Sequence, residues 1–328
     1  MITVIGLLAL FIVWGVVSAR REYYARTDDQ HIFQNVTIAA VHPAALASFY
    51  IEALGCEIIP ADGGFELPGE SSAIVLRLPG YRQGPTLRII PCSTSPLCGP
   101  LEVNDRGYAH LCFETNDVPG LVQKAVEAGG TISSTFDRIE KSLSVYTKDP
   151  EGNTIEVHIP LPAPFNPYTF YRALKSVWQI KRRRSDPQRS KVRFIHVNII
   201  SEDWKETAEF YRKTIHARPT GMKRDYKGLF IEQMVGIKGV TVKGRHIALP
   251  GYRNGGPTFE LFTYNKPANQ GPPGLADRGI IATGFLVHDL MQTVTAIETA
   301  GGQIIRRPEN GMAVVTDRDR NIIQLVQR

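Results

Sequence analysis

The sequence predicts an α+β protein that contains two tandem domains of the same fold. The first observation is an internal repeat, in which Leu-Pro-Gly-Tyr-Arg begins at Leu78 and begins again at Leu249. The second is the spacing of the copies, which is 161 residues (210 less 49) between the Phe-Tyr pairs at Phe49 and Phe210. A repeat of this length indicates a duplicated domain and not a solenoid of short units. The third is size, because 328 residues of 43% hydrophobic composition suffice for about two domains with substantial cores.

Each copy has the same predicted order of strand, helix, strands, second strand, second helix and closing strands. In the first copy, helices are expected at residues 44–54 and 118–128, and the second ends at Gly129-Gly130, since glycine commonly terminates a helix. In the second copy, helices are expected at residues 204–215 and 291–300. The strands of the first copy are expected at residues 33–40, 73–78, 86–91, 109–114, 142–147 and 154–159. The strands of the second copy are expected at residues 194–200, 258–264, 282–287, 313–316 and 321–327.

The amino-terminal residues 1–20 are predicted to be a transmembrane signal-anchor. Residues 2–19 carry no charge and, at about 1.5 Å per residue, would form a helix about 27 Å long. Three arginines follow this segment and nothing basic precedes it, so the positive-inside rule predicts a single-pass membrane protein whose globular part faces the cytosol. The alternative is a cleaved signal peptide and secretion, because residues 17–19 would suit the signal peptidase.

Residues 161–192 are predicted to be a Pro-rich and basic helical linker between a first domain at residues 32–160 and a second at residues 193–328. Apolar residues from Tyr168 onwards approximate one helical face, and the run ends in Lys181-Arg182-Arg183-Arg184. One interpretation is a basic amphipathic helix on an anionic membrane leaflet, and the other is a linker helix packed against a domain. The lysines and arginines that give the net charge of +6 concentrate in this segment. A domain that binds nucleic acid would carry a basic face through its body, so nucleic acid is not an expected partner.

The four cysteines are predicted to be free thiols. They all lie in the first copy, and four in this length of chain are too few for a disulfide scaffold. No CxxC motif or matching Cys/His pair completes a tetrahedral metal site around them. The four are Cys56, Cys92, Cys98 and Cys112.

Three segments of the first copy carry a family resemblance, and the last is the most specific. They are Phe49-Tyr50-Ile51-Glu52-Ala53-Leu54-Gly55, Gly107-Tyr108-Ala109-His110-Leu111-Cys112-Phe113 and Asp149-Pro150-Glu151-Gly152-Asn153-Thr154-Ile155-Glu156. With them the chain resembles the vicinal oxygen chelate superfamily, which includes glyoxalase I, bleomycin resistance proteins and extradiol dioxygenases. The resemblance covers about residues 32–160 and 193–327.

The resemblance implies four βαβββ modules that pair to form two cups, each around a divalent metal. In such proteins each module supplies one ligand from its first strand and one from its last. Carried over by position, the ligand sites are Asn35 and Arg88 in the first module, His110 and Glu156 in the second, His196 and Glu260 in the third, and Ala282 and Gln324 in the fourth. Only the two middle modules keep a His and a Glu.

The pairing of the modules decides whether a complete site exists. If neighbouring modules pair, neither cup holds a full set of ligands. If the second module pairs with the third and the first with the fourth, as in fused glyoxalase I, one cup holds His110, Glu156, His196 and Glu260. We favour this crossed pairing, because retention of one site explains a pattern that random loss would leave only by coincidence.

Two imidazoles and two carboxylates suit Zn, Ni, Mn, Co or Fe better than Ca. The resemblance implies a metal-dependent lyase or isomerase of the glyoxalase-like class, which acts on a small oxygenated molecule through an enolate or alkoxide. With a cytosol-facing membrane anchor, a hydrophobic substrate is one option. Glu156 or Glu260 would then act as the catalytic base. The alternatives are a non-catalytic ligand-binding protein of the bleomycin-resistance type and a ring-cleaving dioxygenase. A monomer is expected, since a duplicated chain can form both cups itself.

Overall fold

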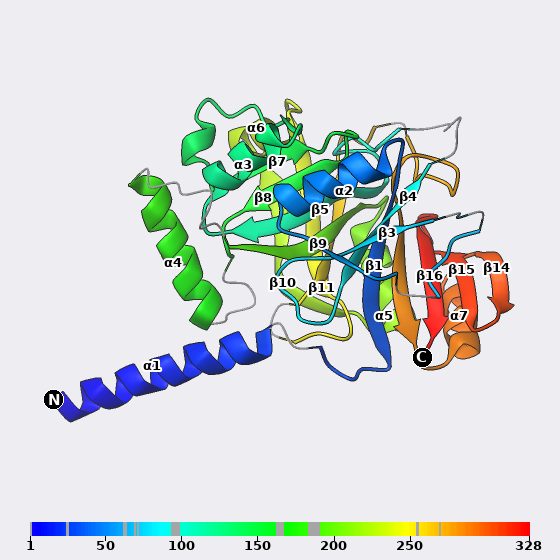
Figure 1. Ribbon diagram of the computed structural model, residues 1–328, viewed down its shortest axis with the longest axis horizontal. Coiled ribbons are helices and arrows are strands. Elements are labelled where there is room, and N and C mark those ends of the chain that lie inside the picture. Colours follow the sequence, from blue (N-terminus) through cyan, green and yellow to red (C-terminus); the bar gives the residue numbers. More distant parts are fainter. Residues whose placement is uncertain are drawn as a thin grey trace.

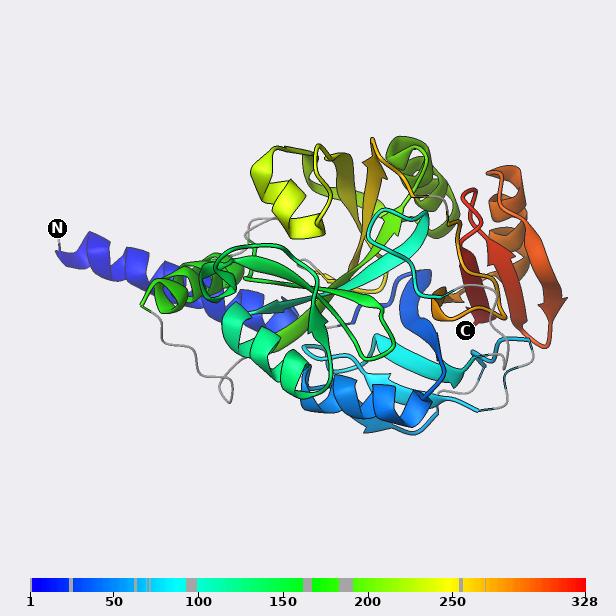
Figure 2. The ribbon, with the colours of Figure 1, turned by 90° about the horizontal axis from the view of Figure 1, so that it is seen from above.

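Two sheets of eight strands form the body of the protein (Figures 1 and 2). In spatial order the first sheet is β14 (Ile304–Glu309), β15 (Met312–Thr316), β16 (Ile322–Gln327), β13 (Gly279–Val287), β1 (His31–Ala40), β4 (Thr86–Pro91), β3 (Ile74–Arg77) and β2 (Glu57–Ile59). The second is β10 (Arg218–Lys227), β11 (Thr241–Ala248), β12 (Thr258–Tyr264), β9 (Val192–Ile200), β5 (Gly107–Thr115), β8 (Thr154–His158), β7 (Ser144–Lys148) and β6 (Thr131–Ile132).

The computed structural model describes residues 2–23, 26–61, 64–68, 70, 72–92, 99–161, 167–182, 191–253, 256–268 and 270–328. Cys98, the Pro-rich residues 162–166 and Arg183-Arg184 lie outside this part of the chain. Cys56, Cys92 and Cys112 are free thiols, as predicted.

The helices that follow the first strand of each module pack against the sheets. In the first sheet these are α2 (Pro43–Glu52) and α7 (Leu290–Thr299), and in the second they are α3 (Val118–Glu127) and α5 (Trp204–Ile215). Three of the four begin after an aspartate whose carboxylate accepts a backbone N–H of the first turn, which stabilises the helix start. The remaining helices are α1 (Ile2–Tyr23), the 3₁₀ helix η1 (Ile139–Lys141), α4 (Pro167–Lys181) and α6 (Leu229–Val235).

Each sheet combines one half of each sequence copy. β5 and β9 pair antiparallel, with Cys112 opposite His196, and so join the second module to the third. β1 and β13 pair in the same way, with Thr37 opposite Ala282, and join the first module to the fourth. The predicted crossed pairing is therefore confirmed, and the alternative in which neighbouring modules pair is wrong. The α+β class is confirmed as well.

The two sheets share a core of aromatic side chains. Phe33 on β1 and Phe285 on β13 have ring centroids 5.5 Å apart. Phe259 on β12, which belongs to the other sheet, lies 5.9 Å from Phe33 and 6.1 Å from Phe285. All three rings are fully buried. Aromatic rings at these separations add to the apolar burial that holds the sheets together.

The repeated Leu-Pro-Gly-Tyr-Arg turn fastens each copy to the other. The hydroxyl of Tyr81 in the first copy donates to the backbone carbonyl of Phe194 in the second, at 3.0 Å. The hydroxyl of Tyr252 in the second copy donates to the backbone carbonyl of Phe33 in the first, also at 3.0 Å. The two contacts are reciprocal, which gives both tyrosines a structural role.

Glycine in this turn is required by the close approach of the facing strand. Gly80 has φ +92°, and a Cβ there would lie 2.5 Å from Cγ of Arg193. Gly251 has φ +91°, and a Cβ there would lie 2.6 Å from Cγ2 of Ile32. Any larger residue would push the two copies apart, which explains the glycine at both turns.

The amino-terminal helix α1 lies beside α4 at one end of the molecule (Figures 1 and 2). Within the described residues, no helix has both the length and the apolar character that crossing a membrane requires, so the predicted span at residues 1–20 is not supported. The apolar side chains of α1 are nevertheless exposed, among them Leu8, Phe11 and Trp14.

Helix α4 docks on the second sheet through a face different from the one the sequence suggests. Its buried residues include Arg172 and Ser176, and the Arg172 guanidinium pairs with the buried carboxylate of Glu114 on β5. The predicted apolar face is largely exposed instead, with Leu174 and Trp178 at 57% and 46% exposure. This docking agrees with a linker helix packed against a domain, and it leaves the apolar face exposed. The ion pair of Glu114 explains why the polar face is the buried one, because a buried carboxylate needs a partner.

Candidate metal centre

The four predicted ligands lie together on the second sheet. His110 is on β5 and Glu156 on its parallel neighbour β8, whereas His196 is on β9 and Glu260 on its parallel neighbour β12. All four side chains are buried, and one ligand atom from each lies within 4.8 Å of the others. The central β5–β9 pair brings two ligands from each copy to one place.

The spacing of these atoms matches a tetrahedral site. The Nε2 atom of His110 lies 3.3 Å from Nε2 of His196 and 3.3 Å from Oε2 of Glu156. The Nε2 atom of His196 lies 3.3 Å from Oε2 of Glu156 and 3.3 Å from Oε2 of Glu260. The remaining His–Glu pair, His110 with Glu260, is 3.6 Å apart. With metal–ligand bonds of about 2.0–2.2 Å, the corners of a tetrahedron are roughly 3.3–3.6 Å apart. These five distances therefore fit one divalent ion, and the sixth pair, Glu156 with Glu260, lies within 4.8 Å.

The electrostatics of the four groups favour positive charge between them. Burial alone would raise the pKa of Glu156, but hydrogen bonds with His110 and His196 outweigh burial and hold this pKa below its ordinary value. The pKa of Glu260 is lowered against burial in the same way, chiefly by His196. Burial would lower the pKa of His196, yet the Glu260 carboxylate and the hydrogen bonds of both glutamates raise it to about 9. A divalent cation bound between the four side chains would supply this positive charge, and the imidazoles that bind it would then be neutral.

A further histidine, His246 on β11, was missed by the sequence reasoning. Its Nε2 atom lies 3.1 Å from Oε1 of Glu260, and its Nδ1 atom lies 2.9 Å from Oγ1 of Thr258. The side-chain amide of Asn198 donates to Oε2 of the same glutamate at 3.1 Å. Glu260 is therefore held from both sides. His246 stands opposite Glu260 in the β11–β12 ladder, and it was missed because β11 was not predicted as a strand.

A second group of possible ligands overlaps the first. Cys112, His158 and His196 also offer atoms within 4.8 Å of one another. Burial and the charges of the two glutamates raise the pKa of the Cys112 thiol well above its ordinary value, so the thiol stays protonated and is a poor ligand. The Nδ1 atom of His158 contacts the backbone carbonyl of Ile159. The His/Glu quartet is therefore the better-suited set.

The outer ligand positions are filled by protein. Arg88 forms an ion pair with Glu70, and both side chains are buried. The side-chain amide of Gln324 donates to the carbonyl of Phe65 at 3.0 Å. Leu67, in the same segment, packs in an apolar cluster with Ala282. Phe65, Leu67 and Glu70 thus contact the positions that correspond to the quartet. This agrees with the prediction that this half of the molecule holds no complete ligand set.

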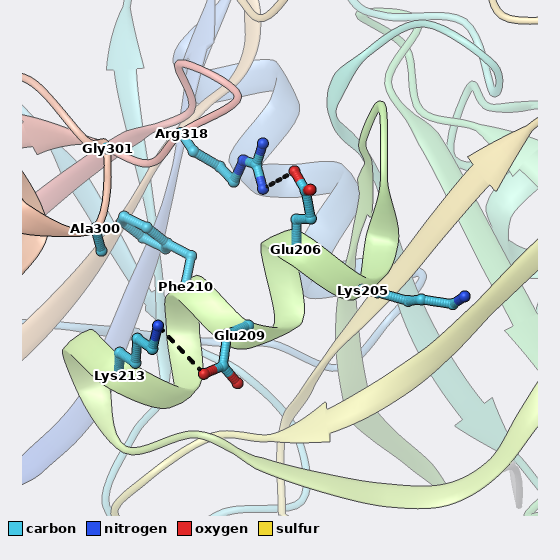
Figure 3. A pocket seen from close by; sticks show the side chains of 8 residues that line it. All are labelled: Lys205, Glu206, Glu209, Phe210, Lys213, Ala300, Gly301 and Arg318. Carbon is cyan, nitrogen blue, oxygen red and sulfur yellow. Dashed lines mark ion pairs between the residues drawn. The ribbon is translucent and has the colours of Figure 1, made fainter.

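A small cavity adjoins the quartet, whereas a larger groove beside α5 does not. A groove of about 590 Å³ lies beside α5 and is lined by Lys205, Glu206, Glu209, Phe210, Lys213, Ala300, Gly301 and Arg318 (Figure 3). Its charges largely pair with one another, Arg318 with Glu206 and Lys213 with Glu209, and it contains no member of the quartet. A cavity of about 250 Å³ opens directly on Glu156 and Glu260. Chemistry at the quartet would take place in this smaller cavity.

Paired βαβββ modules with a buried His/Glu set between them define a glyoxalase-like class of protein. Residues 35–158 match the family model described as glyoxalase-like domain, and residues 193–325 match the model of the glyoxalase/bleomycin resistance protein/dioxygenase superfamily. The two matches together cover most of the chain, which therefore belongs to the vicinal oxygen chelate superfamily as a member with fused, duplicated domains.

Solved structures show the same fold over nearly the whole chain. Glyoxalase I from Zea mays is 16% identical, with a TM-score of 0.56 over 90% of this chain and 92% of its own. A putative dioxygenase from Bacillus subtilis is 13% identical, with a TM-score of 0.55 over 93% of this chain and 86% of its own. A search of curated protein sequences found no significant match.

Proposed function

We propose that His110, Glu156, His196 and Glu260 bind one divalent metal ion. The observation that carries the proposal is the near-tetrahedral spacing of four buried ligand atoms, 3.3–3.6 Å for the His–His and His–Glu pairs. Two carboxylates balance the charge of a divalent ion, and the donor set suits Zn, Ni, Mn, Co or Fe. Both sheets are formed within one chain, which supports a monomer as the functional unit.

We further propose that the protein is a metal-dependent lyase or isomerase that acts on a small oxygenated molecule. A bound divalent ion would act as a Lewis acid towards two neighbouring substrate oxygens. Glu156 and Glu260 both border the cavity, so either carboxylate can reach a substrate proton from the side where substrate would enter. His246 and Asn198 orient Glu260, whereas Glu156 accepts a hydrogen bond from Ser144 at 3.1 Å.

A ring-cleaving dioxygenase is the second candidate, because the quartet contains the two histidines and one carboxylate that such chemistry uses. A non-catalytic binding protein has less support. The pairing of neighbouring modules would have favoured that alternative, because it leaves two incomplete sets of ligands, but the strand order pairs the second module with the third instead.

Metal analysis of the purified full chain tests the metal proposal. We expect about one equivalent of metal, lost in His110→Ala and in His196→Ala alike. A metal-free wild-type protein after incubation with each candidate ion would refute the metal site. Oxygen consumption with a chelating diol would then separate the two enzyme classes. A dioxygenase should take up oxygen. A lyase or isomerase should take up none and should exchange a substrate proton with solvent.

We also propose that α1 and α4 hold the protein at the surface of a membrane. Both helices expose apolar side chains, such as Phe11 on α1 and Trp178 on α4, and the exposed Lys175 and Lys181 lie on α4 beside them. A helix with an apolar face and flanking cations is suited to an anionic bilayer surface. We expect the protein to sediment with vesicles that contain phosphatidylserine, and the double variant Leu174→Ser, Trp178→Ser to sediment less. The matched control is Ile305→Ser, which removes an equally exposed apolar residue from β14. Protein that stays in the supernatant with all vesicles would contradict the proposal.

A further inference from the structure

The cavity beside the quartet has an apolar wall and a charged end. Glu156 and Glu260 form the charged end. Tyr146 and Phe262 from the sheet, with Phe230 and Met234 from α6, form part of the remaining lining. A molecule whose oxygens reach the quartet must therefore place the rest of its body against aromatic and aliphatic side chains.

Both copies of the chain hold α6 in place. The backbone N–H of Thr135 donates to the carbonyl of Gln233 at 2.8 Å, and the hydroxyl of Ser134 donates to the carbonyl of Met234 at 2.8 Å. The rings of Phe136 and Phe230 lie 5.7 Å apart. The wall is thus anchored to the second module, although its residues belong to the third.

The described lining of this cavity contains no lysine or arginine. Its carboxylates are matched by the charge of a divalent ion, and its tyrosines stay neutral, with burial and Glu260 raising the pKa of Tyr226 to about 12. Arg224 on β10 is a cation that acts on this lining, because its charge lowers the pKa of Tyr226, but it does not line the cavity. Among the described lining side chains the imidazole of His158 could meet an anionic group, and its Nδ1 atom already contacts the carbonyl of Ile159. An anionic group in the cavity would therefore lose its hydration without gaining a permanently charged partner.

We propose that the cavity selects an uncharged substrate with a compact apolar or aromatic body and two neighbouring oxygens, and that it rejects substrates whose body carries a carboxylate or phosphate. The proposal rests on the metal site proposed above. It narrows the substrate class from small oxygenated molecules in general to uncharged molecules whose apolar body contacts α6.

The test uses the zinc-loaded full chain and two probes of equal shape. One probe is a catechol with an acetyl group on the ring, and the other is the same catechol with a carboxylate in place of the acetyl group. We expect calorimetry to show that the neutral probe binds at least about tenfold more tightly, because the carboxylate would be desolvated without a counter-ion. Equal binding, or tighter binding of the carboxylate, would overturn the proposal.

Two neighbouring residues of α6 provide a matched pair of variants. Phe230 lines the cavity, whereas Leu229 is 68% exposed and does not. We expect Phe230→Lys to bring the carboxylate probe to at least the affinity of the neutral one, and Leu229→Lys to leave the preference as in the wild type. A folded Phe230→Lys protein with unchanged preference would show that α6 does not contact the substrate, and the proposal would fail.

Arg224 provides the strongest competing explanation and therefore its own variant. If the carboxylate probe binds more tightly and Arg224→Ala abolishes this, Arg224 is an anion anchor and the cavity accepts charged substrates. Zinc content is measured in the same samples. Protein that holds about one equivalent of zinc but binds neither probe refutes the substrate class alone, whereas protein without zinc refutes the metal site on which it rests.

Discussion

Metal binding should stabilise this protein only when both sequence copies contribute their ligands. The change is His110→Ala in the first copy or His196→Ala in the second, each of which removes one corner of the tetrahedron. A ligand that binds only the folded state at a concentration of 100 times its Kd stabilises that state by about 2.7 kcal/mol. With an unfolding entropy of about 2.1 cal/mol/K per residue over 328 residues, this corresponds to a rise in Tm of roughly 4 °C.

The assay is thermal unfolding followed by circular dichroism, with and without zinc at that concentration. We expect the rise of roughly 4 °C in the wild type, and none in either histidine variant at the same zinc concentration. Gln324→Ala is the matched control, because Gln324 occupies in the first sheet the position that Glu156 has in the second. This variant should lower the Tm of the metal-free protein, since its hydrogen bond to Phe65 is lost, yet keep the zinc-dependent rise. A full rise in either histidine variant would refute a shared site.

Three further predictions concern other parts of the structure. Arg172→Ala should lower the free energy of unfolding by about 2 kcal/mol in urea titrations, because the buried Glu114 carboxylate loses its closer ion pair and keeps Arg193, 3.8 Å away; an unchanged midpoint would contradict the docking of α4. Burial and two neighbouring histidines lower the pKa of His31 from 6.5 to about 4, so the unfolded state binds more protons between these values and stability should fall as the pH drops from 6.5 to 4. In His31→Phe the loss of unfolding free energy between these pH values should be smaller by on the order of 2 kcal/mol, a value reduced for partial solvent screening. A variant whose stability falls with pH as steeply as that of the wild type would contradict this. Gly244→Ala should reduce the yield of folded protein strongly, since its Cβ would lie 1.9 Å from a backbone oxygen, whereas Gly271→Ala, with nothing within 4 Å, should fold like the wild type.

Strong local patterns made most of the fold predictable from the sequence. The helix at residues 204–215 and the strands at residues 86–91 and 258–264 have the bounds that were expected. These segments combine regular apolar spacing with clear start or stop residues, so local sequence and tertiary packing agree.

The segment between α5 and β12 was poorly predicted for a physical reason. β10 is mostly exposed, with polar residues on both sides, and therefore lacks the alternation that marks a half-buried strand. Helix α6 has only seven residues, and it begins after Gly228 and ends at Gly236, so it reads as a loop. One signal was available: the offset between the copies grows from 161 residues at Phe49 to 171 (249 less 78) at Leu78. The sequence therefore indicates an insertion in the second copy, but it does not indicate that the inserted residues form the wall of the cavity.

The four candidate ligands were found because the family pattern gives one position in each of two strands per module. His246 could not be found in this way, since its place depends on the register of β11 against β12 and not on its own sequence context. The docking of α4 through its polar face was also hidden. It depends on Glu114, a residue from a distant strand that requires a cation beside it.

The antiparallel joints β1–β13 and β5–β9 make the two copies dependent on each other for folding. A chain that stopped near residue 160 would contain β1 and β5 without the strands that cover their edges, although both are buried along their whole length in the intact protein. Unpaired strand edges of this length promote aggregation. Gene fragments that encode one copy should therefore be insoluble alone and recover structure only when the other copy is expressed with them. Because both joints pair a strand of one copy with a strand of the other, the duplicated chain should behave as a single folding unit.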